Sequence, residues 1–212
     1  MSEDNDSHHV AKVDVSYNNQ LETLMSSEAE KALVLYWLHD KSEKRFTKLN
    51  VYITIPVITM STVAGTASIG QSVIFGPGAA APIIIGIVSI TVAILNTIAS
   101  FFGWAKRSEG HRISGNNYAK LHRWISIELA LPREQRIPAK YFLKEIRQQM
   151  DRLGETSPQI PVEIIALFQT EMVKNVKSDV SLPEICNSIH AVTVYSEHNK
   201  LDNSGIKITI TE

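Results

Sequence analysis

The polar residues that could do chemistry lie inside the most apolar part of the chain. Asn96, Thr97 and Ser100 are close together in a segment otherwise built from isoleucine, valine, alanine and leucine. An amide or hydroxyl group in such surroundings needs a hydrogen-bond partner. Two interpretations follow. The Asn96 amide bonds to a serine or threonine of the first of the two apolar runs described below, or it faces a water-filled lumen.

Familiar catalytic and metal-binding motifs are absent from the sequence. It has no glycine-rich phosphate loop, no CxxC pair, no HExxH and no GxSxG. His111 and His122 would lie roughly 16 Å apart along one helix, too far to share a metal ion. His8 and His9 have no further ligands nearby, and Cys186, the single cysteine, is expected to be a small packed side chain. We therefore expect no enzyme activity, no metal and no cofactor.

The polar trio belongs to an uncharged stretch of 57 residues, Leu49 to Ala105. Because 20% of the chain is charged, a gap of this length is very unlikely by chance. A turn-forming cluster, Phe75-Gly76-Pro77-Gly78, divides the stretch into two apolar runs. Each run would reach about 35 Å as a helix, against a hydrocarbon core of about 30 Å. We predict a transmembrane helical hairpin with spans of about 52–75 and 82–104.

A buried pair of helices or strands in a soluble domain is the alternative to a hairpin in lipid. Core helices are usually apolar on one stripe, whereas Ile83 to Leu95 is apolar all round. Runs of this length are too long for ordinary strands. In lipid the backbone must satisfy its own hydrogen bonds, which favours the helix.

Small residues recur at four-residue spacing in both spans, and such rows let helix backbones approach closely in lipid. We expect the two small faces to meet each other, or one of them to meet a neighbouring subunit. The alternative is that small residues are simply common in spans. The residues expected to pack helices or to face a pore are Ser61, Ala64, Gly65 and Ser68 in the first span, with Gly86, Ser89, Ala93, Asn96, Thr97 and Ser100 in the second.

Basic residues bracket the uncharged stretch at both ends. Lys44, Arg45 and Lys48 precede it, and Lys106 and Arg107 follow it, whereas the loop between the spans carries no charge. The positive-inside rule therefore places both termini on the cytosolic side and sets the topology. The first 20 residues contain no apolar signal segment, so we expect insertion to depend on the hairpin itself.

The segments beside the hairpin have helical periodicity. Residues 20–48 read as an amphipathic helix with a candidate break at Ser26-Ser27, and residues 106–177 as a helical region with a candidate break at Ser114–Asn117. Trp37 lies either in an interfacial aromatic belt or against these helices, and its distance from the first span favours the second. Together the segments predict a small cytosolic helical bundle.

The two ends of the chain differ from this bundle. Residues 1–19 form a polar arm, and residues 178–212 form a tail in which Ile206 to Thr211 alternates as a strand would. Two strands alone are marginal in water, so the tail is expected to be loosely ordered or to dock on another chain. Arg133 and Arg136 either lie in a solvated loop or bind anionic headgroups. The fold class predicted is thus an all-α membrane protein with a short β-like tail.

The run Ile55 to Ala67, IPVITMSTVAGTA, resembles the first span of SLATT-type two-transmembrane proteins, closest to versions encoded by large double-stranded DNA viruses. Ser157-Pro158 and Ile160-Pro161 add to the similarity, which covers about Leu33 to Val173. The resemblance implies a membrane-perturbing or pore-forming effector. In a large virus it equally implies a protein of the virion internal membrane.

The function expected is that of a non-enzymatic integral membrane protein. The favoured version is a viral minor capsid or virion membrane protein that links a bilayer to capsid or other structural proteins through its arm and tail. The alternative is a homo-oligomeric pore-forming effector of the SLATT type. Homo-oligomers are expected in both. The net charge of −1 gives no field that would attract nucleic acid.

Overall fold

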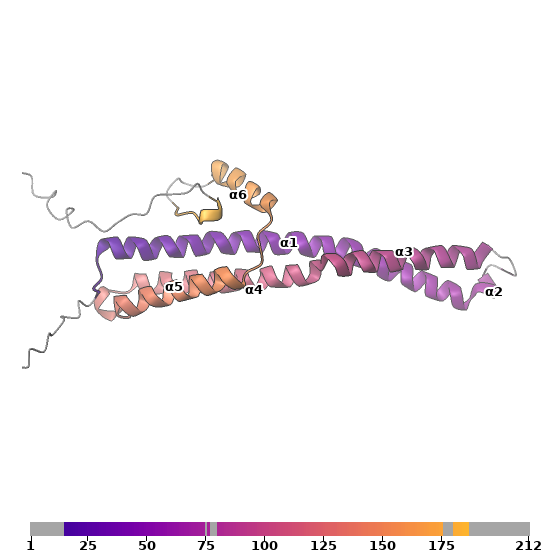
Figure 1. Cartoon of the computed structure of the whole chain (residues 1–212), viewed down its shortest axis with the longest axis horizontal. Helices are drawn as coiled ribbons and strands as arrows, with labels where there is room; N and C mark the ends of the chain where they lie inside the picture. Colours follow the sequence, from indigo (N-terminus) through magenta and orange to yellow (C-terminus); the bar gives the residue numbers. More distant parts are fainter. Residues whose placement is uncertain (1–14, 75, 77–79, 176–179, 187–212) are drawn as a thin grey trace, which may run out of the picture.

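Helices make up all the regular secondary structure in the part of the chain that the structure describes, residues 15–74, 76, 80–175 and 180–186. In this computed structural model, two long antiparallel helical arms lie side by side (Figure 1). The all-α expectation is confirmed for these residues. The helices are α1 (Asn19–Ile69), α2 (Gln71–Ile74), α3 (Ala80–Phe102), α4 (Trp104–Ala130), α5 (Ala139–Thr156) and α6 (Val162–Asn175), with the short 3-10 helices η1 (Arg133–Gln135) and η2 (Glu184–Cys186).

Two predicted features lie outside the described residues. These are residues 1–14 of the polar arm, which include His8 and His9, and residues 187–212, which include the strands predicted in the tail.

α1 is one helix of 51 residues, and it joins the predicted segment 20–48 to the first apolar run. Its first turn is capped by Asn18, whose side-chain oxygen accepts a hydrogen bond from the backbone N–H of Leu21 at 2.7 Å. The candidate break at Ser26-Ser27 does not occur, and the Ser27 hydroxyl donates to the carbonyl of Leu24 in the preceding turn. The apolar run is therefore continuous with the helix before it, as a rod about 75 Å long.

Two glycines end the apolar helices. α1 ends at Ile69 rather than near residue 75, because Gly70 leaves the helical conformation and the four-residue α2 follows. α3 ends at Phe102 rather than at residue 104, because Gly103 has a left-handed φ of 58°. Glycine adopts that conformation without a Cβ clash. A glycine joint therefore separates each apolar helix from the next helix in the chain.

We call the antiparallel pair formed by residues 19–48 and by α4 the stalk, and residues 49–105 the hairpin. α4 runs without the candidate break at Ser114–Asn117. A Cβ atom on Gly115 would lie 3.4 Å from Cβ of His39 and 3.7 Å from a ring carbon of Tyr36. Gly115 is thus a point where the two helices approach closely, which explains a glycine inside a continuous helix.

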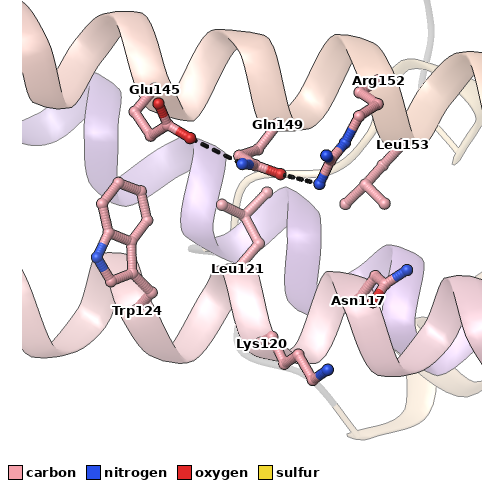
Figure 2. Close-up of a pocket in the computed structure, with 8 residues that line it drawn as sticks. All are labelled: Asn117, Lys120, Leu121, Trp124, Glu145, Gln149, Arg152 and Leu153. Carbon is pink, nitrogen blue, oxygen red and sulfur yellow. Dashed lines mark hydrogen bonds between the residues drawn. The ribbon is translucent and has the colours of Figure 1, made fainter.

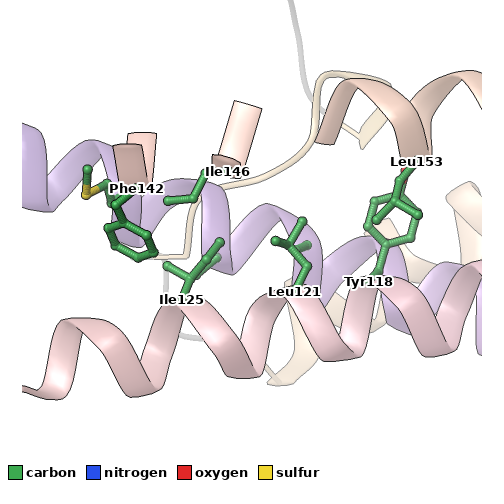
Figure 3. Close-up of a cluster of buried hydrophobic side chains, with 9 residues drawn as sticks. Tyr118, Leu121, Ile125, Phe142, Ile146 and Leu153 are labelled. Atoms are coloured by element: carbon green, nitrogen blue, oxygen red, sulfur yellow. The ribbon is translucent and has the colours of Figure 1, made fainter. Parts of the chain in front are cut away.

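The main core of the stalk forms where α5 lies against α1 and α4 (Figure 3). Ile125 of α4 and Phe142 and Ile146 of α5 are fully buried, and each such side chain contributes about 1.5–3 kcal/mol by burial. α5 continues past Gly154 to Thr156. The remaining buried members of this core are Met25, Ala29, Ala32, Tyr118, Leu121 and Leu153.

A second core fixes α6 and η2 to another face of α1. The Trp37 and Phe168 rings lie 5.2 Å apart at 60°, so Trp37 packs against the helical bundle rather than in an aromatic belt. Cys186 is buried in the same cluster, and burial raises the pKa of its thiol to about 11. This thiol is therefore a packed apolar group rather than a nucleophile.

Candidate functional site: the apolar hairpin and its junction with the stalk

Two helical stretches are long and apolar enough to cross a membrane, α1 and the arm formed by α3 and α4. The most apolar 18-residue window is 6% buried in α1 and 0% buried in the second arm. A core helix of a soluble protein would be mostly buried. Here Ile58, Ile83 and Ile90 have 59%, 62% and 63% of their surface exposed. The hairpin therefore presents apolar side chains outward along its length.

The two apolar helices contact each other along a narrow seam. The less exposed residues recur with alternating spacings of three and four, which is the pattern of left-handed coiled-coil packing. Most of them are medium-sized or large aliphatic side chains rather than the predicted small ones. The seam comprises Ile53, Val57, Met60, Ala64 and Ala67 of α1 and Ile85, Val88, Val92, Leu95 and Ala99 of α3.

The structure places most of the predicted packing residues outside this seam. Of the ten, Ala64 is buried and Gly86 is half-buried, whereas the others are exposed. The Thr97 hydroxyl donates to the carbonyl of Ala93 at 2.9 Å, so its own helix satisfies it. The Asn96 amide makes no side-chain hydrogen bond within the described residues. We call the exposed set the small-polar face; it comprises Ser61, Gly65, Ser68, Ser89, Ala93, Asn96, Thr97 and Ser100.

These exposed residues lie on one side of the hairpin. With 100° of rotation per residue, the small residues of α1 lie roughly 80° around the helix axis from its seam; they are Ser61, Gly65 and Ser68. Those of α3 lie roughly 80° from its seam in the same rotational sense; they are Ser89, Asn96 and Ser100. Two antiparallel helices that turn their seams toward each other then carry both sets on the same side. Isoleucines occupy the other flank of α3. The two small faces thus lie beside each other and open outward, where a neighbouring copy could meet them.

The five predicted topology-setting residues lie where the hairpin joins the stalk. Lys48, Lys106 and Arg107 are exposed, and the Thr47 and Ser108 hydroxyls, 2.6 Å apart, place α1 and α4 in register at this level. Lys44 and Arg45 lie about one turn further from the hairpin, and each forms an ion pair, with Asp40 and Glu163 respectively.

A buried histidine pair just beyond this junction was not predicted from the sequence. The Nδ1 atoms of His39 and His111 lie 2.8 Å apart, and each side chain is 1% exposed. Burial lowers the pKa of both imidazoles to about 4, reinforced at His39 by His111 and at His111 by Arg107. At neutral pH both rings are therefore uncharged, and one donates to the other. The rings of Phe46 and Tyr118 stack on the pair, so it holds α1 to α4.

The two histidines lie 72 residues apart in the sequence, so no local motif links them. The only signal was the position of each histidine within its helix. Each occupies a position at which its helix faces the other. His122 does not join them. Its Nδ1 lies 2.9 Å from the carbonyl oxygen of Ala29, so His111 and His122 are engaged in different contacts.

Arg133 and Arg136 pair with Glu22 in the first turn of α1, at the end of the stalk farthest from the hairpin. Their hydrogen bonds, Arg133 first, lower the pKa of the Glu22 carboxyl to about 2. Since α4 alone spans about 40 Å between this end and the hairpin, these arginines do not reach headgroups beside it. The solvated-loop interpretation is also incomplete, because Arg136 is held by the ion pair and by two backbone carbonyls.

The clearest pocket is a shallow hollow of about 270 Å³ between α4 and α5 (Figure 2). Gln149 donates to Glu145 and accepts from Arg152, so the polar groups above the hollow bond to one another. Trp124 and Leu121 form its apolar wall. Among the described residues, no three histidine, cysteine, aspartate or glutamate side chains come close enough to hold a metal ion.

The fold and the hairpin define a class: an all-α chain in which two exposed apolar helices, each long enough to cross a membrane, continue into a helical stalk. Comparisons with protein-family models, with curated proteins and with solved structures find no match for the chain.

Proposed function

We propose that the chain is a non-enzymatic integral membrane protein whose hairpin crosses a lipid bilayer. The observation that carries the proposal is the apolar surface of the hairpin, which remains almost wholly exposed within the fold. Large contiguous apolar surfaces on soluble monomers are rare and mark contact with a partner or a membrane. The isoleucine-rich flank and the absence of charge over 57 residues support contact with lipid.

The proposed topology has both termini in the cytosol. The 23 residues of α3 reach about 35 Å, and the seven basic residues within 40–48 and 104–112 outnumber three acidic ones at the same end of the hairpin. The test is cysteine labelling in a chain that also carries Cys186→Ala. In sealed vesicles with the cytosolic side inward, Ala80→Cys should react with a membrane-impermeant maleimide. Ser126→Cys should react only after permeabilisation, and equal labelling of both in sealed vesicles would refute this topology.

We propose further that the hairpin self-associates through the small-polar face. In lipid, the amide of Asn96 is costly unless another polar group or water meets it. Ser61, Gly65 and Ser68 on the same side of the hairpin allow the backbone of a second copy to approach closely. A homo-oligomer therefore offers the Asn96 amide a polar partner within the bilayer.

The role that this architecture favours is that of a membrane-anchored scaffold. α1 passes unbroken from the hairpin through the stalk, and the His39–His111 pair ties it to α4. Such a rod holds its far end at a fixed distance from the bilayer. The SLATT-like run Ile55 to Ala67 motivates the setting that we propose, a virion membrane or minor capsid protein whose arm and tail contact capsid proteins. Cross-linking of intact particles should join the tail to a capsid chain, and a tail without such cross-links would contradict this role.

A pore-forming oligomer is the second candidate, and the small-polar face favours it specifically. If the face surrounded a lumen, Asn96 would meet water rather than a neighbouring hydroxyl. Purified protein reconstituted in liposomes would then release an entrapped dye. Asn96→Leu should abolish release, whereas the matched change Ile87→Leu on the other flank of α3 should preserve it. Intact liposomes with fully inserted protein would rule the pore out and leave the scaffold standing.

A further inference from the structure

We infer that the cations at the junction of hairpin and stalk form a binding surface for the headgroups of anionic phospholipids. The surface consists of Lys48, Lys106 and Arg107 and is called the junction belt. The inference rests on the proposed insertion of the hairpin, and it adds the class of lipid that the protein selects.

The three cations of the junction belt have no carboxylate counterion in the part of the chain that the structure describes. All three are exposed, and within the described residues none has a carboxylate within 4.0 Å. They stand at one level of the molecule, because the hydrogen bond between Thr47 and Ser108 sets the heights of their helices. That level is immediately beside the last uncharged residues of the hairpin, where a bilayer's phosphate groups would lie.

The next layer of cations shows the opposite arrangement. Lys44 pairs with Asp40 at 2.6 Å, Arg45 with Glu163 at 2.7 Å, and Arg112 with Glu109 at 2.6 Å. These residues lie about one turn further from the hairpin than the junction belt. The protein therefore neutralises its cations one turn away from the bilayer and leaves those beside the bilayer unneutralised. Anionic headgroups supply the missing counterions at the level where lipid is present.

Aromatic rings position two of the three cations. The Lys48 ammonium lies 5.8 Å from the centre of the Tyr52 ring, and the Arg107 guanidinium lies 5.8 Å from that of Phe46. Contact with an aromatic ring orients a cation while leaving most of its N–H donors free. Tyr52 is 66% exposed and belongs to the apolar run, so it holds Lys48 close to the interface. These donors are available to a phosphate group.

The expected preference follows from the number of charges. One Lys or Arg near an anionic surface strengthens binding by about fivefold, so loss of three should weaken it by on the order of a hundredfold. The probe is phosphatidylglycerol, added to the full-length protein in neutral detergent against phosphatidylcholine. Native mass spectrometry counts the lipids that remain bound. Wild type should retain phosphatidylglycerol selectively, and Lys48→Gln/Lys106→Gln/Arg107→Gln should lose that selectivity.

The matched control is Lys44→Gln/Arg45→Gln/Arg112→Gln, which removes the same number of charges from the paired layer. It should keep the selectivity. Equal loss in both triple variants, or no selectivity in wild type, would overturn the inference. A competition with inorganic phosphate separates headgroups from free anions: displacement of the lipid by millimolar phosphate would also overturn it. If the wild type remains in membranes but selects no lipid, this inference fails alone and the proposed function stands.

Discussion

At the scale of single residues, His39 and His111 make the stalk sensitive to mild acid. Their folded pKa is about 4, below the value of about 6.5 in an unfolded chain. As the pH falls below about 6.5, the unfolded chain takes up protons that the folded stalk does not, so the stability present above that pH is lost progressively down to about pH 4. The melting temperature in detergent should therefore fall between pH 7 and pH 5. His122→Gln should keep this dependence, and a flat profile in the wild type would contradict the account.

Gly115 offers a second test at this scale. A Cβ atom fits at 3.4 Å from His39, but a larger side chain would push α1 away from α4. Gly115→Leu should destabilise the stalk by about 1–3 kcal/mol in denaturant unfolding. Gly154, which has nothing within 4 Å of an added Cβ, provides the control. Gly154→Ala should be neutral or stabilising by up to about 1 kcal/mol, and similar losses in both variants would argue against close approach at Gly115.

At the scale of elements, the hairpin helices were predictable because their signal is local. An uncharged run and a turn-forming cluster are read directly along the chain, and both apolar helices are present. Their ends were less predictable. Gly70 and Gly103 interrupt helices that remain apolar on both sides, so hydropathy carried no signal there. Conversely, Ser26-Ser27 does not interrupt α1, because packing of the surrounding turns outweighs weak local propensity.

Contacts between elements were the part that the sequence could not supply. The small residues suggested a packing face, but the seam uses Val57, Val92 and Leu95 instead. A helix that is apolar on all sides has no contrast in polarity, so its sequence does not indicate which side faces the neighbouring helix. The His39–His111 contact likewise depends on the register of two helices far apart in the chain. The sequence therefore indicated where a residue lies within its helix, but not which residue of another helix it contacts.

The outward direction of the small-polar face gives a prediction at this scale. In a chain carrying Cys186→Ala, Ser89→Cys should form a disulfide between copies under mild oxidation in membranes. Ile87→Cys is the control, two residues away on the other flank of α3, and should cross-link much less. The measurement is the ratio of dimer to monomer on a non-reducing gel. Equal cross-linking at both positions would mean that collisions, rather than a defined face, bring the copies together.

At the scale of the whole molecule, one helical rod has an apolar surface over one part of its length and a polar surface over the other. Residues 49–105 expose apolar side chains, whereas the stalk buries its apolar residues beneath α5 and α6 and keeps its charges outside. The change occurs within one turn at the junction belt, without a break in α1. This division explains why the mean hydropathy of the chain is close to zero, at −0.03, since a strongly apolar quarter of the chain and a polar remainder offset each other.

The most direct test of the central claim is fractionation of cells that express the full-length chain, followed by extraction of the membranes with alkaline carbonate. Because lipid is proposed to solvate the hairpin, the protein should remain in the pellet and leave it only with detergent. A chain that is released by carbonate and stays monodisperse in detergent-free buffer would contradict the claim, and the proposed scaffold, pore and lipid surface would fall with it.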